Sequence, residues 1–274
     1  MFTCCRWLIA GCLAWACVIG SAWGQPPLDT LPDARARIQK QEARLLSTLQ
    51  MTPADAVGSP QPIALSKKPV LRYDDPTRAN EFGSVWLWSA DGRPTALLDS
   101  YRHTEGLWAM VTVQLDDGAF DVAMDGQPWW TPREPEVNWL PVPNGDSVAA
   151  NERTRMIQMR NIARKFAAHE FWDPNNSRFE LRLLPRPLHR YKDTARGIQD
   201  GTVFVFANGT NPEIILMLEA RGKGSDLAWQ MGFARLGHAE MHVLLDQQTI
   251  WTVPRANPTK RSESYWLDFV QDPN

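Results

Sequence analysis

Two histidines and a glutamate in one short segment are the residues of this chain best suited to metal chemistry. His238, Glu240 and His242 alternate with the apolar residues Ala239 and Met241. Side chains two positions apart on a strand share a face, so a strand here would present both imidazoles and the carboxylate together. Two imidazoles and a carboxylate can hold zinc and leave one coordination position open. The same alternation is typical of a half-buried strand whose polar face meets water, and both interpretations stay open.

A second polar cluster follows two prolines. Arg186, His189 and Arg190 surround Leu188 and precede Tyr191. Guanidinium groups pair with carboxylates and phosphates, which makes this segment a candidate anion-binding site. Prolines also remove backbone donors, so the segment is equally typical of a bulged corner or sheet edge whose arginines bond neighbouring carbonyl groups.

The remaining sequence holds no familiar catalytic motif. It contains no nucleophile elbow of the Gly-x-Ser-x-Gly type, no dinucleotide-binding glycine pattern and no EF-hand loop. Catalytic triads need not be local in sequence, so serine chemistry stays open. We therefore assign no catalytic residue and expect no cofactor.

The first 24 residues are typical of an export signal. Arg6 is followed by an apolar run over residues 7–22, and the small residues Ala22 and Gly24 precede a cleavage position before Gln25. The run is shorter than the roughly 20 residues that a membrane-spanning helix needs. We therefore expect a cleaved, exported chain that is periplasmic or extracellular. Lipidation at Cys12 is an alternative, although the apolar stretch before Cys12 is short for it.

Cysteine usage follows from this expectation. All four cysteines of the chain lie in the signal segment: Cys4, Cys5, Cys12 and Cys17. The mature protein is expected to have no disulfide and no thiol chemistry. Most of the 13 tryptophans follow the signal and are interleaved with aliphatic residues, which favours a role in the core over a stacking surface for flat ligands.

Charge narrows the classes of partner. The chain has 29 basic and 31 acidic residues, a formal net charge of −2. A nucleic-acid binder needs a basic excess, so we expect no nucleic-acid partner. No later apolar run has the length of a membrane span. An unidentified protein or small molecule is the partner that remains.

The chain divides into four expected regions. These are a signal peptide over residues 1–24, a helix over 25–50, a proline-rich linker over 51–72 and one domain over 73–274. Short apolar runs joined by Asp-Gly and Asn-Gly turns predict antiparallel hairpins throughout the domain. Met156, Met159, Ile162 and Phe166 recur at helical spacing, which predicts one long helix over residues 147–171.

These elements predict an α+β fold. We expect a large curved antiparallel sheet packed on one long amphipathic helix, with an additional N-terminal helix. The proline-rich segment over residues 132–144 is expected to be a long surface loop.

Several stretches together resemble a group of exported proteins from planctomycete bacteria. They are Val85-Trp86-Leu87-Trp88 with Asp91-Gly92-Arg93-Pro94, the helix around residues 160–166, and the segments 181–191 and 200–213. The resemblance covers residues 81–251. That group has no assigned activity, so the resemblance implies export and one continuous domain but assigns no site. The cluster at residues 238–242 lies outside the quoted stretches.

Three functional hypotheses follow. The leading one is a non-enzymatic exported binding or accessory protein, with contacts through residues 132–144 and the segment 186–191. A second is a metal-dependent hydrolase that uses His238, Glu240 and His242. A third is a carrier of apolar ligands, whose tryptophans, such as Trp86, Trp88 and Trp108, would line the concave face of the sheet.

Overall fold

Strands dominate the structure. The computed structural model describes residues 31–54, 61–75, 80–90, 92–104 and 106–272. The predicted signal segment and its four cysteines lie outside the described residues. Strand makes up 53% of the structure and helix 13%, in several sheets with two helices. The predicted α+β fold, one large sheet packed on one long helix, is therefore wrong.

The first sheet has six strands in the order β18-β6-β5-β4-β2, and β3 also pairs with β4. Its strands are β2 (Ala64–Leu65), β3 (Leu71–Asp75), β4 (Asn80–Ala90), β5 (Arg93–Thr104), β6 (Leu107–Gln114) and β18 (Tyr265–Gln271). The antiparallel β4–β5 pairing confirms the hairpin that the Asp-Gly turn predicts.

The second sheet is larger and has nine strands. Its order is β17-β16-β10-β11-β13-β14-β15-β9, with β12 also pairing with β13. Its strands are β9 (Asn138–Pro141), β10 (Phe166–Phe171), β11 (Phe179–Leu183), β12 (His189–Asp193), β13 (Ile198–Asn208), β14 (Asn211–Arg221), β15 (Ala228–Arg235), β16 (Glu240–Leu245) and β17 (Gln248–Val253). The predicted hairpin across the Asn-Gly turn is confirmed as β13–β14.

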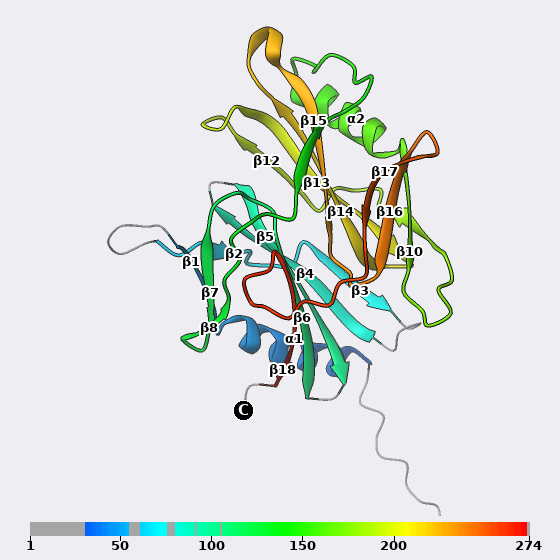
Figure 1. Cartoon of the computed structure of the whole chain (residues 1–274). Helices are drawn as coiled ribbons and strands as arrows, with labels where there is room; N and C mark the ends of the chain where they lie inside the picture. Colours follow the sequence, from blue (N-terminus) through cyan, green and yellow to red (C-terminus); the bar gives the residue numbers. More distant parts are fainter. Residues whose placement is uncertain (1–30, 55–60, 76–79, 91, 105, 273–274) are drawn as a thin grey trace, which may run out of the picture.

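A small third sheet and two helices cover the outer faces. The third sheet has the order β1-β7-β8. Its strands are β1 (Leu49–Pro53), β7 (Phe120–Met124) and β8 (Gln127–Trp130). Helix α1 (Leu31–Leu46) lies beside the first sheet, and α2 (Glu152–Ala163) lies on the second (Figure 1). A short 3-10 turn, η2 (Gly224–Asp226), follows β14.

Three apolar layers hold these elements together. The inner core lies between the first and second sheets and includes Val85, Leu97, Val205, Ile215 and Met217. Alternate residues of the same strands face outward, because successive side chains on a strand point to opposite faces. Burial on both faces explains why these strands read as continuous apolar runs.

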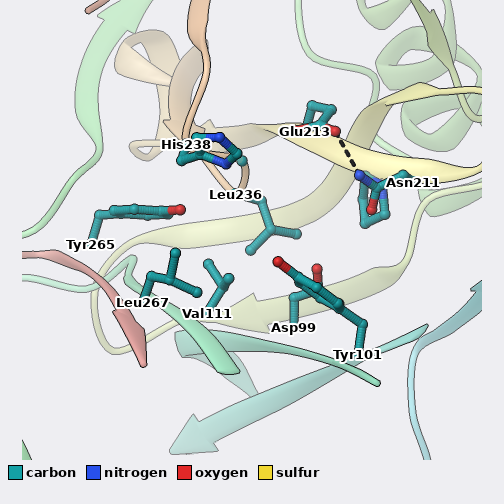
Figure 2. Close-up of a pocket in the computed structure, with 11 residues that line it drawn as sticks. Asp99, Tyr101, Val111, Asn211, Glu213, Leu236, His238, Tyr265 and Leu267 are labelled. Carbon is teal, nitrogen blue, oxygen red and sulfur yellow. Dashed lines mark hydrogen bonds between the residues drawn. The ribbon is translucent and has the colours of Figure 1, made fainter. Parts of the chain in front are cut away.

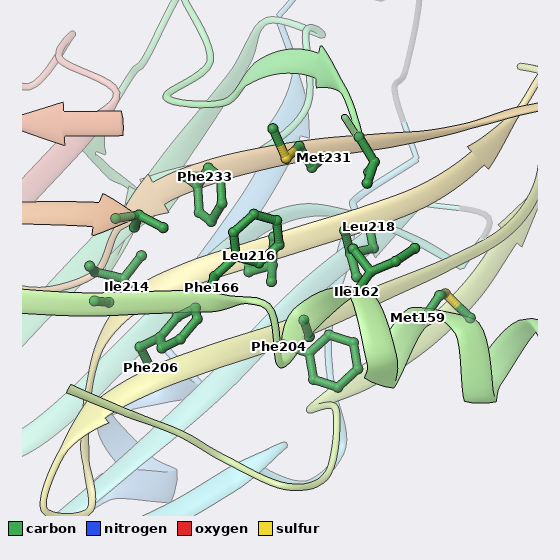
Figure 3. Packing of buried hydrophobic residues seen from close by; sticks show 14 of the residues in the cluster. Met159, Ile162, Phe166, Phe204, Phe206, Ile214, Leu216, Leu218, Met231 and Phe233 are labelled. Carbon is green, nitrogen blue, oxygen red and sulfur yellow. The ribbon is translucent and has the colours of Figure 1, made fainter. Parts of the chain in front are cut away.

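The outward-facing residues form the other two layers. The α1 core joins α1, the third sheet and the outer face of the first sheet, and contains Trp86, Trp88 and Trp108. The α2 core joins α2 to the second sheet, where Phe204 and Leu216 pack against the helix (Figure 3). The three tryptophans proposed to line a carrier's cavity are thus packed in a core.

The long helix predicted over residues 147–171 is two elements. Asn151 caps α2 by accepting a hydrogen bond from the Thr154 amide at 2.9 Å, and the helix ends at Ala163. From Phe166 the chain is strand β10, antiparallel to β16. Phe166 fits the helical spacing, but it also begins the period-two pattern of a strand, and pairing with β16 decides between them.

The predicted linker over residues 51–72 belongs to the folded body. It contains most of β1, all of β2 and the start of β3. The preceding helix ends at Leu46 instead of residue 50. Likewise, the loop predicted over residues 132–144 contains the edge strand β9. Within the described ranges, no helix is both long and apolar enough to cross a lipid bilayer.

Candidate ligand site between the two sheets

The inner face of β14 carries a carboxyl group at each end of an apolar stretch. Glu213 and Glu219 flank Ile215 and Met217, and all four face the first sheet because they alternate along one strand. Glu213 is 2% exposed and Glu219 is 0% exposed. A buried carboxylate is costly unless it is paired and hydrogen-bonded, so the surroundings of the two glutamates are informative.

Internal cations pair with the carboxylate of Glu219. Arg93 Nε lies 3.2 Å from Glu219 Oε1, and Arg221 pairs with Oε2 of the same carboxylate. The hydroxyl of Tyr191 donates to Glu219 Oε1 at 2.6 Å. Arg93 also pairs with Asp116. This end of the inner core is a closed network in which the fold supplies its own positive charge.

The Glu213 end holds a cavity of about 70 Å³ (Figure 2). The cavity lies between β5, β6 and β18 of the first sheet and β14 and the β15–β16 turn of the second. Its lining residues are Asp99, Tyr101, Val111, Asn211, Pro212, Glu213, Leu236, Gly237, His238, Tyr265 and Leu267. No lysine or arginine is among these described residues.

The side chain of Glu213 is fixed by close packing. Asn211 Nδ2 donates to Glu213 Oε1 at 2.6 Å. A Cβ atom at Gly237 would lie only 1.8 Å from Glu213 Oε2. The amides of Leu236 and Gly237 donate to the backbone carbonyl of Glu213 at 2.7 and 3.1 Å. The β15–β16 turn therefore packs directly against the Glu213 carboxylate, and any residue other than glycine at position 237 would clash with that carboxylate.

Asp99 is the second carboxyl group of the cavity. It is 3% exposed, and Tyr73 Oη lies 2.9 and 2.8 Å from its two carboxylate oxygens. Burial raises the pKa of Asp99 to about 8; the Tyr73 hydrogen bond opposes this shift and the charge of Glu42 adds to it. Asp99 is therefore largely protonated at neutral pH.

Tyr265 brings a buried polar atom without a partner. The residue is 5% exposed, and its hydroxyl makes no hydrogen bond in the described structure. Figure 2 shows that hydroxyl pointing into the space between the two sheets. The Arg235 guanidinium lies 5.4 Å from the Tyr265 ring centroid and donates to the carbonyl of Pro254 at 2.5 Å. A buried hydroxyl without a partner costs free energy, so this atom marks a position that a ligand can satisfy.

The residues proposed to bind metal are divided between two places. His238 is exposed and lines the cavity, whereas Glu240 and His242 lie on β16. His242 Nε2 donates to Glu240 Oε1 at 2.9 Å, and the ring stacks on His169 at 4.8 Å between centroids. Across the described chain, no group of three or more histidine, cysteine, aspartate or glutamate side chains is placed to hold a metal ion. Ala239, Met241 and Val243 are buried, as the half-buried strand interpretation requires.

The proposed anion-binding residues 186–191 point to different surroundings. Arg190 makes two bonds to the buried Asp200, at 2.8 and 2.6 Å, so it belongs to an internal ion pair. Tyr191 bonds Glu219, and His189 Nε2 donates to the carbonyl of Gly92 at 2.9 Å. Arg186 is exposed. The structure thus gives three of the four side chains internal partners, which agrees with the alternative of a bulged corner.

Sequence reasoning missed Asp99, Glu213 and Tyr265. A signal for the two carboxyls exists in the apolar runs around them. Asp99 stands two positions from Leu97, and Glu213 two positions from Ile215. A carboxyl at an inward position of a strand covered on both faces needs a partner, so it marks either an ion pair or a site.

Comparison with known proteins gives no matching family, no similar curated protein and no similar solved structure. The resemblance to exported planctomycete proteins therefore stays a prediction, and the function is argued from the cavity itself.

Proposed function

We propose that this is an exported, non-enzymatic binding protein whose inter-sheet cavity takes a small, positively charged group of its ligand. One observation carries the proposal: two buried carboxyls, Asp99 and Glu213, and the unpartnered hydroxyl of Tyr265 surround one cavity. The chemistry of a recognition site is expected to be complementary to its ligand, and this lining offers oxygen acceptors and aromatic rings.

The two ends of the inner core support a cationic ligand. At one end the carboxylate of Glu219 is balanced by Arg93 and Arg221 from within the chain. At the other end the described lining contains no lysine or arginine. A cation that enters the cavity would do for an ionised Asp99 what the arginines do for Glu219, with Glu213 as a further acceptor. The attraction between a cation and a carboxylate is stronger in a buried site than in water, because the surroundings have a lower dielectric constant.

The size of the cavity argues against the apolar carrier. Sites that enclose a whole drug-sized ligand measure roughly 300–1,000 Å³. A cavity of about 70 Å³ admits one functional group, while the remainder of the ligand stays outside. His238 is exposed and lines the same cavity, so its side is the route for the attached part of the ligand.

The test is a titration followed by NMR. Methylammonium chloride is added to the purified protein, with sodium acetate as the probe of opposite charge and sodium chloride as the control for ionic strength. We expect shift changes that cluster around the cavity with methylammonium only. Asp99→Asn and Glu213→Gln should each weaken binding at least tenfold at pH 9, where Asp99 of the wild-type protein is largely ionised.

Glu240→Gln is the matched control because Glu240 lies on β16, outside the cavity lining. It should bind methylammonium as the wild type does. Acetate binding at the cavity, or methylammonium binding that neither cavity variant weakens, overturns the proposal. Circular dichroism of each variant shows whether it folds.

Export is tested separately. The full chain is expressed in a bacterial host, and the N-terminal residue of the protein recovered from the periplasm or the medium is determined. A chain that begins at Gln25 supports export with cleavage. A chain that keeps Met1 and stays inside the cell overturns it.

A further inference from the structure

The acceptors around the cavity define the kind of cation more closely. The acidic groups Asp99 and Glu213 come from opposite sheets, and Tyr265 comes from β18 of the first sheet and lines the same cavity. After burial, the charges of Asp99 and Glu213 are among the causes that raise the pKa of the Tyr265 phenol. The three groups line the same cavity, where each presents an oxygen that a bound group can contact.

A primary ammonium group fits these acceptors best. A cavity of about 70 Å³ has room for about two water molecules, judged by the volume that each occupies in the liquid. The ammonium group has three N–H donors and no acceptor. A quaternary ammonium is bulkier and has no N–H donor, so it would leave the Tyr265 hydroxyl without a hydrogen-bond partner.

A metal ion fits less well than an ammonium group. Calcium takes six to eight oxygen ligands and magnesium requires an octahedral set. The described residues contain no group of three or more acidic or histidine side chains placed to hold a metal ion. Two carboxyls and a phenol are too few for a hard divalent cation, but they match three N–H donors in number.

We propose that the ligand carries a primary ammonium group that donates to Asp99, Glu213 and Tyr265, and that Asp99 releases its proton to solvent when this group enters. The inference rests on the proposed function and names its ligand class. The proton balance is simple, because the O–H bond of Asp99 breaks, its electron pair stays on the carboxylate, and a water molecule or buffer base takes the proton.

The surroundings of Asp99 explain why a proton is held there before the ligand arrives. Asp99 is buried, the charge of Glu42 also raises its pKa, and its hydrogen-bond partner Tyr73 is neutral. Other titratable or charged groups lie on the elements packed around the cavity. They are Glu42 on α1, Tyr73 on β3, Tyr101 on β5, Glu213 on β14, Arg235 on β15, His238 before β16 and Tyr265 on β18. Arg235 pairs with Glu136 at 3.6 Å, so an incoming ammonium is the cation that can favour the ionised form of Asp99.

The experiment measures the Kd of methylammonium by NMR between pH 6 and pH 9.5. Methylammonium keeps its charge over this range, as lysine does. Because the ligand needs ionised Asp99, binding should weaken about tenfold for each pH unit below about 8 and level off above it. Asp99→Asn should bind weakly with no such dependence. His238→Ala should keep the pH dependence of methylammonium binding above pH 7. This result would show that the dependence comes from Asp99 and not from His238.

Tetramethylammonium chloride is the second probe, and we expect it to bind at least tenfold more weakly. If both cations bind equally and without pH dependence, the ammonium inference fails while the proposed cation site stands. If neither cation binds at any pH, both fail. If methylammonium prefers the site but Asp99→Asn keeps the full pH dependence, proton release from Asp99 is excluded.

Discussion

Tyr73 Oη lies 2.9 and 2.8 Å from the two carboxylate oxygens of Asp99, and both residues are buried between the two large sheets. A phenol has one proton, so it donates to one oxygen at a time, while protonated Asp99 can donate in return. The Tyr73 ring fits against Gly83, where an added Cβ would lie 2.3 Å from Tyr73 Cζ. This pair gives Asp99 a neutral hydrogen-bond partner, which does not balance the charge of an ionised carboxylate.

The first prediction concerns stability and pH. The pKa of Asp99 is raised to about 8 in the folded protein, against about 4 in an unfolded chain. Between these values the folded protein keeps a proton that the unfolded chain releases. The contribution of Asp99 is thus fully present below pH 4 and is lost as pH rises through 8, with a slope of at most about 1.4 kcal/mol per pH unit.

Urea denaturation at pH 5, 6, 7, 8 and 9 checks this sign. Other groups titrate as well, so the informative quantity is the difference in unfolding free energy between wild type and Asp99→Asn. The wild type should lose its advantage steadily from pH 5 to pH 8. Curves that stay parallel over this range would show that Asp99 is ionised in the folded protein.

The second prediction concerns the glycine beside Glu213. Gly237→Ala should destabilise the protein by roughly 1–3 kcal/mol, because the new methyl group would meet Glu213 Oε2 and force the carboxylate or the turn to move. Gly118→Ala is the matched control, since a Cβ there has no atom within 4 Å. Thermal unfolding of the two variants gives the comparison. Equal Tm values would mean that the turn yields without cost.

The third prediction concerns the closed network around Glu219. Arg93→Ala removes a cation that is 3% exposed and pairs with both Glu219 and Asp116. It should cost roughly 3–5 kcal/mol, because two buried carboxylates each lose one of their cationic partners. Arg178→Ala breaks an exposed pair with Glu180 and should cost roughly 1 kcal/mol or less. Denaturant midpoints that fall by equal amounts would contradict the difference in burial.

The fourth prediction concerns the docking of α1. Leu45 is 2% exposed in the α1 core, so Leu45→Ala should cost roughly 2–5 kcal/mol. Ile157 lies on α2 and is 49% exposed, and Ile157→Ala should be nearly neutral. Chemical denaturation monitored by tryptophan fluorescence suits this test, because Trp86 and Trp88 belong to the same core. A neutral Leu45→Ala would show that α1 adds little to the fold.

The fifth prediction concerns zinc. Because His242 is bonded to Glu240 while His238 lines the cavity, the three residues should not act as one ligand set. Calorimetric titration with zinc should give the same weak binding for the wild type and for a double variant with His238→Ala and His242→Ala. Tight binding that the double variant loses would restore the metal hypothesis.

Local sequence signals were sufficient to predict the hairpins but insufficient to predict how the sheets and helices pack into layers. The β4–β5 and β13–β14 hairpins follow from turn residues between apolar runs. The strand β10 does not, because Phe166 and Ala167 suit a continued helix as well as a strand, and the contact with β16 that decides is distant in sequence. The prolines over residues 51–72 suggest a linker, but short strands at a sheet edge tolerate proline too.

The cavity between the two sheets was not predicted from the sequence, because its lining residues are distant from one another in the chain. Single-sequence motifs favour dense clusters such as His238 to His242, whereas the cavity gathers residues from five separate segments. Asp99 and Tyr265 line the same cavity because β5 and β18 both flank β6. The polar residues worth noticing were those isolated within apolar runs, since each needs a partner that the run itself does not supply.

The positions of Glu213 and Glu219 also limit how the β13–β14 hairpin can misalign. Their neighbours Ile214 and Leu218 face α2. A shift of β14 by one residue would therefore place both carboxylates in the apolar α2 core. The same shift would turn Ile214 and Leu218 toward the first sheet. Side chains alternate along a strand, so no partial shift avoids this exchange. The two glutamates therefore select one alignment while the chain folds, before any ligand is present.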